Sequence, residues 1–139
     1  YGPGHGPEFA RLHHDAGAGA WSAGANDPHQ FLQVDLGGPR LIYGVATQGR
    51  SPNAEIGRGS QHFVLTYLVE TSEDGMSWTK QTPHRPGAAV PEDETRFVFT
   101  GNRDCTSVVA HTLDRVVRAR YVKFIPRTCS GHIAMRVEV

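Results

Sequence analysis

The stretch Gln30-Phe31-Leu32-Gln33-Val34-Asp35-Leu36-Gly37 decides the fold of this chain. Its apolar residues Leu32, Val34 and Leu36 alternate with polar ones, which is the pattern of a half-buried β-strand. The same period of two recurs along the chain, so we expect further strands over residues 20–23, 41–47, 67–71, 96–100, 107–113, 121–125 and 133–139. Residues typical of turns separate these segments. No segment shows the 3.6-residue apolar period of a helix together with capping residues at its ends. The sequence therefore predicts an all-β domain of eight short strands.

Length and charge narrow the possibilities further. A chain of 139 residues fits one domain spanning residues 1–139. Its 14 basic and 14 acidic side chains cancel, so no overall field attracts nucleic acid or an anionic membrane. No stretch approaches the roughly 18 apolar residues of a membrane-spanning helix. Because the chain begins with Tyr and not Met, we expect a mature product or a piece excised from a longer chain.

Ordered motifs extend outward from the opening stretch on both sides. Before it come Gly19-Ala20-Trp21-Ser22-Ala23 and Asn26-Asp27; after it come Gly44-Val45-Ala46-Thr47-Gln48-Gly49-Arg50, Glu73-Asp74-Gly75 with Trp78, Phe99-Thr100-Gly101-Asn102-Arg103-Asp104, Ala119-Arg120-Tyr121-Val122-Lys123-Phe124-Ile125-Pro126 and His132-Ile133-Ala134-Met135-Arg136-Val137-Glu138-Val139. In their order and spacing these motifs resemble the discoidin family, also called coagulation factor V/VIII type C (F5/8 type C) domains. The resemblance covers nearly the whole chain.

This resemblance implies a distorted eight-stranded antiparallel jelly-roll barrel of the galactose-binding-like kind. It also implies a non-catalytic domain outside the cell, either secreted or in the ectodomain of a membrane protein. Family members bind phosphatidylserine membranes, collagen, galactose-type glycans or receptor proteins through loops at one end. By the family's topology that end should comprise residues 1–11, 24–29, 48–61, 101–106 and 127–132.

Polar residues in these segments are the candidate ligand contacts. Arg50 matches an arginine that some collagen-binding relatives use, although it also fits a structural role in pinning its loop. Arginine, asparagine, aspartate and histidine side chains together suit sugar hydroxyls. The predicted ligand-binding set is Tyr1, His5, His29, Arg50, Asn53, Arg58, Asn102, Arg103, Asp104 and His132. For the histidines, simple solvation is the alternative.

The two cysteines and two acids raise separate questions. In the family's topology Cys105 and Cys129 both fall in loops at the ligand end, and the extracellular context favours a disulfide between them over two free thiols. Some glycan-binding relatives hold a structural Ca²⁺, for which Asp15 and Glu138 are the candidate ligands. No other cofactor is expected.

The sequence thus predicts a recognition or adhesion module that binds a glycan or a matrix or cell-surface protein, with collagen included. The alternative is a phosphatidylserine-binding domain that inserts Tyr1, Phe9 and Ile56, although this apolar set is small. An enzyme is not expected, because metal-ligand spacing, a nucleophile motif and paired carboxylates are all lacking. Relatives of the lectin kind often form oligomers, so an oligomer is possible here too.

Overall fold

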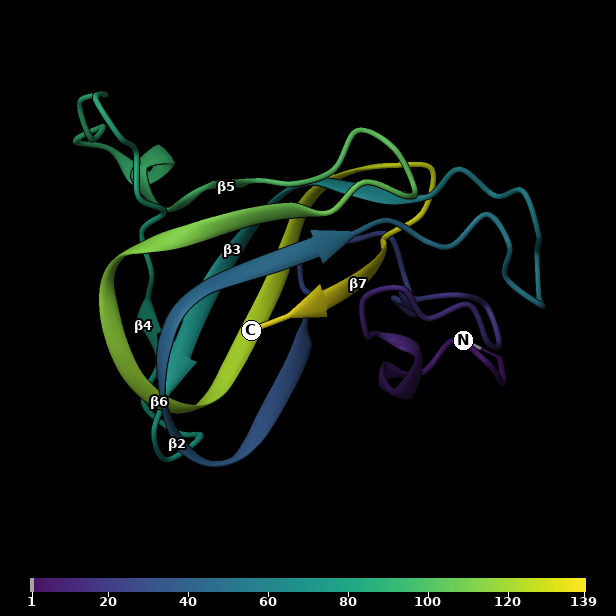
Figure 1. Ribbon diagram of the computed structural model, residues 1–139, viewed down its shortest axis with the longest axis horizontal. Coiled ribbons are helices and arrows are strands. Elements are labelled where there is room, and N and C mark those ends of the chain that lie inside the picture. The colour runs from purple at the N-terminus through teal and green to yellow at the C-terminus, as the bar shows by residue number, and fades with distance from the viewer. Residues whose placement is uncertain (1) are drawn as a thin grey trace.

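The computed structural model describes residues 2–139 and shows one antiparallel sheet that folds over itself (Figure 1). Its strands follow the path β1-β7-β2-β6-β3-β4, and β5 pairs with β3. Their bounds are β1 Trp21–Ser22, β2 Leu32–Gln48, β3 Phe63–Ser72, β4 Thr79–Lys80, β5 Phe99–Thr100, β6 Val109–Ser130 and β7 Ala134–Glu138, with 3₁₀ turns η1 Pro7–Phe9 and η2 Glu94–Phe97. The all-β jelly-roll class is confirmed. The described sheet has seven strands and is not closed into a barrel, because β1 and β4 end its path.

Two long strands carry the chain between the layers of the fold. β2 unites the strands expected over 31–36 and 41–47, and β6 unites those expected over 107–113 and 121–125. The turn signal Gly37-Gly38-Pro39, between two expected strands, is instead an irregularity inside β2, where the register against β6 shifts between Asp35 and Arg40. Gly37 has φ +80°, a conformation that side-chain-bearing residues rarely adopt. A bulge of this kind bends a strand without ending it, so β2 and β6 curve together as Figure 1 shows.

One predicted strand is much shorter in the structure, and one strand was not predicted. Within residues 96–100 only Phe99–Thr100 pairs as a strand, because the chain up to Phe97 forms η2, capped by the Asp93 carboxylate. β4 is a two-residue strand whose Thr79 lies opposite Thr71 of β3. Neither short element has enough alternating residues to be detected by periodicity.

The core lies between the folded halves of the sheet. Tyr67 and Phe99 are fully buried and stack with ring centroids 5.4 Å apart, and Phe124 packs 5.9 Å from Tyr67. Trp21 is also buried. Trp78, in contrast, is half-buried on the outer face, where the ammonium of Lys123 lies 3.9 Å from its ring.

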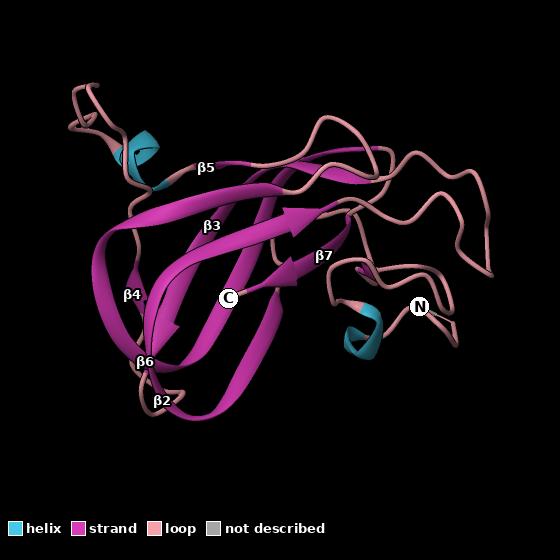
Figure 2. Ribbon diagram, in the orientation of Figure 1, coloured by secondary structure: helices cyan, strands magenta, loops and turns pink. Residues whose placement is uncertain are grey.

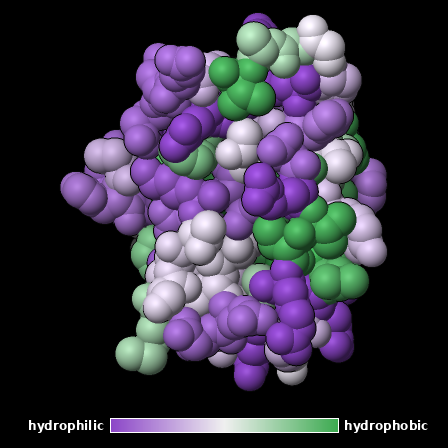
Figure 3. All heavy atoms as spheres, turned by 90° about the vertical axis from the view of Figure 1, so that its left-hand side faces the viewer, coloured by the Kyte–Doolittle hydropathy of each residue, from purple (hydrophilic) through white to green (hydrophobic). Residues whose placement is uncertain are grey.

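The two ends of the molecule differ in loop content. Long loops and the N-terminal segment gather at one end, and the segment that carries η2 projects from the other (Figures 1 and 2). Viewed from the side opposite the long loops, the surface is largely hydrophilic and is interrupted by a compact hydrophobic cluster (Figure 3). Among residues 2–139, none of the helical segments has the length and apolar character that crossing a membrane requires.

Candidate functional site

The predicted ligand-end segments do meet at one end of the fold, and hydrogen bonds connect them. The Ala18 amide donates to the Gly4 carbonyl, which ties the first segment to the loop before β1. The Asn26 side chain donates to the Gly131 carbonyl at 2.9 Å, which joins the segments at 24–29 and 127–132. The Cys105 thiol lies against the chain at Ser60, which brings 101–106 onto 48–61. This loop end therefore behaves as one connected surface.

The buried Arg50 side chain joins the loop before β1 to the 48–61 segment. Only 4% of the residue is exposed, and its guanidinium donates to the Ala18 carbonyl at 2.7 Å and to the Ile56 carbonyl. A third nitrogen, Nη1, lies 3.5 Å from Nδ1 of His62. The rigid fork of arginine suits several acceptors at once. Arg50 thus pins the 48–61 loop and does not present its side chain to a ligand, which corrects its assignment as a surface contact.

Arg136 of β7 also connects several loops through hydrogen bonds, a role that the sequence did not predict. It is 3% exposed and donates to the carbonyls of Gly49 at 2.8 Å, His14 at 3.2 Å and Cys105 at 2.9 Å. Burial lowers the pKa of its guanidinium, while nearby Asp15 acts in the opposite direction. Three loops are therefore fixed to β7 by one side chain. Its only sequence signal is a charged residue within an otherwise largely apolar strand.

The 101–106 segment is shaped by Asn102 and Asp104. Asn102 is 1% exposed; its amide donates to the carbonyls of Thr47 at 3.1 Å and Ser107 at 2.8 Å. It is a structural residue, so its prediction as a ligand contact is corrected as well. The Asp104 carboxylate accepts the amides of Thr106 and Ser107, and these bonds hold the pKa of Asp104 below its usual range. Asp104 itself remains exposed.

Other predicted residues lie at the loop end without converging on a common point. Most of these side chains are fully exposed, and no described hydrogen bond involves the side chains of His29, Asn53, Arg58 or Arg103. Tyr1 lies outside the described residues.

A polar hollow of about 420 Å³ opens at this end, between the first segment and β1. His5, Glu8, Trp21 and Ser22 line it, together with Gly24. Ser22 is 3% exposed, and within residues 2–139 its hydroxyl has no hydrogen-bond partner. Buried hydroxyls are normally paired, so this one lacks its usual partner in the free domain.

Three half-buried histidines, His5, His62 and His132, lie at this end, and His5 lines the hollow. The rings of His62 and His132 lie 6.3 Å apart, and Nε2 of His132 donates to the Ala23 carbonyl at 2.7 Å. The pKa of His5 and that of His62 are both lowered, first by burial and then by the charge of Arg50. At neutral pH these two imidazoles are therefore uncharged. Of the predicted ligand residues, the structure brings His5 and His132 together and adds His62.

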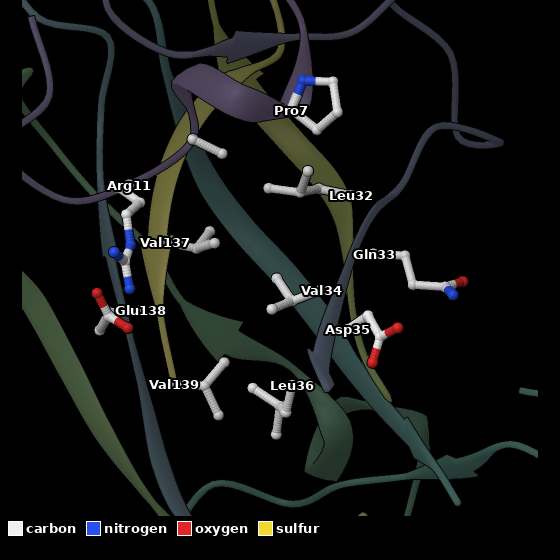
Figure 4. Close-up of a pocket in the computed structure, with 11 residues that line it drawn as sticks. Pro7, Arg11, Leu32, Gln33, Val34, Asp35, Leu36, Val137, Glu138 and Val139 are labelled. Atoms are coloured by element: carbon white, nitrogen blue, oxygen red, sulfur yellow. The ribbon is translucent and has the colours of Figure 1, made fainter. Parts of the chain in front are cut away.

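A second hollow, of about 380 Å³, lies between β2 and β7 and is bordered by Pro7, Ala10 and Arg11 of the first segment (Figure 4). Leu32, Val34 and Leu36 line one wall and Val137 and Val139 the other. None of the predicted ligand-binding residues borders this apolar groove. The polar hollow beside β1 is therefore the better candidate site.

Comparison with known proteins identifies the family. The family model described as F5/8 type C domain matches residues 1–139, the entire chain. The chain belongs to the F5/8 type C domain family. Domains of this family bind ligands without catalysing a reaction, so this F5/8 type C domain is a binding module and not an enzyme.

Solved structures share the fold at low sequence identity. Discoidin II from Dictyostelium discoideum superposes with a TM-score of 0.79 at 20% identity, over 99% of this chain and 50% of that one. The domain thus spans about half the length of discoidin II. A CBM32 of AlyQ in complex with 4,5-unsaturated mannuronic acid gives 0.61 at 15% identity, covering 99% and 84%. The family 32 CBM of Clostridium perfringens NanJ, in complex with galactose, gives 0.51 at 19%, covering 82% and 64%.

The predicted disulfide of this F5/8 type C domain is wrong in the structure, where Cys105 and Cys129 are both free. The Cys105 thiol is buried against the carbonyls of Ser60 and His62, whereas the Cys129 thiol lies near Asn26. The two sulfur atoms therefore occupy different surroundings. Burial raises the pKa of both thiols, so neither is a reactive thiolate at neutral pH.

The predicted calcium ligands also have other partners. The Asp15 carboxylate accepts from the Ser51 hydroxyl at 2.5 Å and lies 3.7 Å from the Arg136 guanidinium, while Glu138 borders the apolar groove. Within residues 2–139 no group of three acidic, imidazole or thiol side chains gathers to hold a metal ion. These side chains do not fit a shared calcium site. A bound structural Ca²⁺ stays a prediction, and ligand binding with and without EDTA tests it.

Proposed function

We propose that this domain is an extracellular recognition module that binds a glycan in the polar hollow at its loop end. The observation that carries the proposal is a hollow lined by Ser22, whose buried hydroxyl lacks a partner, together with His5 and Glu8. Sugars present hydroxyls that both donate and accept hydrogen bonds, which matches this mixture of groups. A volume of about 420 Å³ falls within the usual range for small-ligand sites.

Rigid loops support the same conclusion. Arg50 and Arg136 fix the surrounding segments to five backbone carbonyls, so a ligand meets a surface that is already ordered. Preordering lowers the entropy lost on binding. Two solved relatives of this fold were determined with galactose and with an unsaturated mannuronic acid, which makes a sugar the natural first class of ligand to test.

The membrane alternative has weaker support in the described residues. Of its two described apolar candidates, Phe9 is half-buried with its ring 5.8 Å from His14, and Ile56 is 45% exposed. One exposed apolar side chain buries too little area for stable membrane docking. Liposomes with and without phosphatidylserine, and collagen, therefore serve as comparison ligands.

The test is a glycan-array screen followed by calorimetry on Ser22→Ala. Ser22→Ala should weaken binding of the best glycan about tenfold, the value of roughly one hydrogen bond. The same change should leave thermal stability unchanged or slightly higher, because it removes a buried hydroxyl that lacks a partner. Ser77→Ala, at an exposed serine in the turn after β3, is the matched control and should change neither quantity.

Two results would contradict the proposal. One is unchanged glycan affinity in Ser22→Ala, which would place the site elsewhere. The other is binding to phosphatidylserine liposomes or collagen with none to glycans. Localisation is tested separately, by fractionating source cells with an antibody against the domain; recovery inside the cell would contradict the extracellular part.

A further inference from the structure

We propose that the glycan bound at the loop end is acidic, and that His5, His62 and His132 beside Arg50 select its negative group. This inference rests on the proposed function and names the class of sugar that the site prefers. The group is a carboxylate or a sulfate, which share the charge and the acceptor oxygens that imidazolium donors recognise.

Arg50 is a buried cation that forms no ion pair among residues 2–139. The residue is almost fully buried, and its described partners are two backbone carbonyls and the His62 ring. Within residues 2–139 no carboxylate lies within 4.0 Å of its guanidinium, whereas Arg136 has Asp15 at 3.7 Å. Buried charges are usually paired, so an anion arriving nearby gains attraction that the protein itself does not satisfy.

The three imidazoles stand between this charge and the surface. His62 lies 3.5 Å from Arg50 through Nδ1, and its ring is 6.3 Å from that of His132. Both Arg50 and His132 act electrostatically on His5, which lines the polar hollow. The three histidines come from the first segment, from the residue before β3 and from the turn after β6, so the fold alone brings them together.

None of the nearby acids forms a described ion pair with Arg50, and most have hydrogen-bond or ion-pair partners elsewhere in the loops. Asp27 accepts the His29 amide and the Gln30 side chain, Glu55 accepts the Gly17 amide, Asp104 accepts the Thr106 and Ser107 amides, and Asp15 faces Arg136. Glu8 is the carboxylate that lines the hollow itself, and it is exposed. The thiols of Cys105 and Cys129 are neutral.

A dependence on pH follows from this arrangement. In the free domain burial and Arg50 keep the pKa of His5 and that of His62 below 6.5. A bound anion favours the protonated rings and raises these pKa values, so binding takes up protons. Affinity for an acidic sugar should therefore increase as the pH falls through the pKa of the bound state. A neutral sugar offers no such charge and should bind almost equally across this range.

The experiment is calorimetry at pH 5.5 and 7.5 with three probes: oligogalacturonate, the same oligosaccharide after carboxyl reduction, and galactose 6-sulfate. We expect the oligogalacturonate to bind about tenfold more tightly at pH 5.5, since a rise of one pKa unit at one imidazole corresponds to that factor. The reduced oligosaccharide should change by less than about twofold. Galactose 6-sulfate distinguishes a general anion site from one shaped for a carboxylate.

Variants assign the effect to the cluster. His62→Gln and His132→Gln should each reduce the pH-dependent gain while leaving the fold intact, as judged by thermal unfolding. His84→Gln is the matched control, because His84 is an exposed histidine paired with Asp114 at the opposite end of the molecule. Equal binding of acidic and neutral sugars with no pH effect would overturn the inference and leave the proposed function standing. Binding of none of the probes or of any arrayed glycan would overturn both.

Discussion

Arg136 offers the most direct test of how the loop end is built. Its guanidinium donates to three backbone carbonyls from three loops, and the residue is 3% exposed. Arg136→Met keeps much of the volume but removes all three hydrogen bonds, leaving the carbonyls of Gly49, His14 and Cys105 without this donor. Arg136→Lys keeps the charge, but a single ammonium cannot reach acceptors arranged for a planar fork.

The size of the loss can be worked out from these contacts. Hydrogen bonds to a charged donor contribute about 1.5–3 kcal/mol each, offset by the desolvation of the buried guanidinium, so a net loss of about 3–5 kcal/mol is expected. At roughly 2.1 cal/mol/K of unfolding entropy per residue, this corresponds to a fall in Tm of about 10–17 °C. Arg136→Lys should lose more than half of that amount.

Thermal unfolding followed by circular dichroism measures this change, with Arg118→Met as the control. Arg118 pairs with Glu73 at 3.0 Å, but both side chains are more than half exposed, so its loss should cost less than about 1 kcal/mol. A Tm for Arg136→Met within 3 °C of that of the unmodified domain would refute the view that the hydrogen bonds of this residue hold the loops together.

Three further predictions concern other parts of the fold. Gly49→Ala should destabilise the domain by about 1–3 kcal/mol in chemical denaturation, because the added Cβ would lie 2.9 Å from both the Asp104 carbonyl oxygen and the Cys105 Cα. An unchanged free energy of unfolding would contradict that packing. The hydrogen bonds from Arg120 hold the pKa of Asp35 at about 2, so this pair stabilises the fold above the unfolded carboxyl pKa, and the contribution disappears as the pH falls from about 4 to 2. In an NMR titration of the Asp35 carboxyl, Arg120→Gln should move the midpoint to higher pH. An unchanged midpoint would disprove the assignment. Thiol titration of the denatured, unreduced domain should find two free thiols, and dithiothreitol should leave Tm unchanged; detection of none would restore the disulfide.

The fold class was predictable because alternation of apolar and polar residues survives in every long strand. Leu32, Val34 and Leu36 face inward as the opening stretch predicts. What periodicity could not show is strand continuity. Gly37-Gly38-Pro39 has the composition of a turn, yet the pairing of β2 with β6 continues past it after a change of register. Tertiary pairing decides that outcome, and it leaves no local signal.

The loop end was predictable as a place, but its individual residues were harder to assign. Arg50 and Asn102 look like surface residues in a list of polar side chains, and only the folded loops supply the carbonyls that make their burial favourable. His62 was missed as a site residue because it lies just outside the expected 48–61 segment. Ser22 was missed because an unpaired hydroxyl is a property of its surroundings and not of the residue.

Two buried arginines order the loops at this end, as the expected disulfide would have done. Unlike a disulfide, each of them also adds a positive charge. Arg50 and Arg136 together hold five carbonyls from loops that are distant in sequence, so the loops are ordered without a covalent link. A disulfide is neutral, whereas each guanidinium adds a positive charge, and only Arg136 has a carboxylate close by. The 14 acidic and 14 basic residues balance over the chain, but Arg50 forms no ion pair among residues 2–139. Arg50, which helps to order the loops, therefore also supplies the positive charge that favours an acidic ligand.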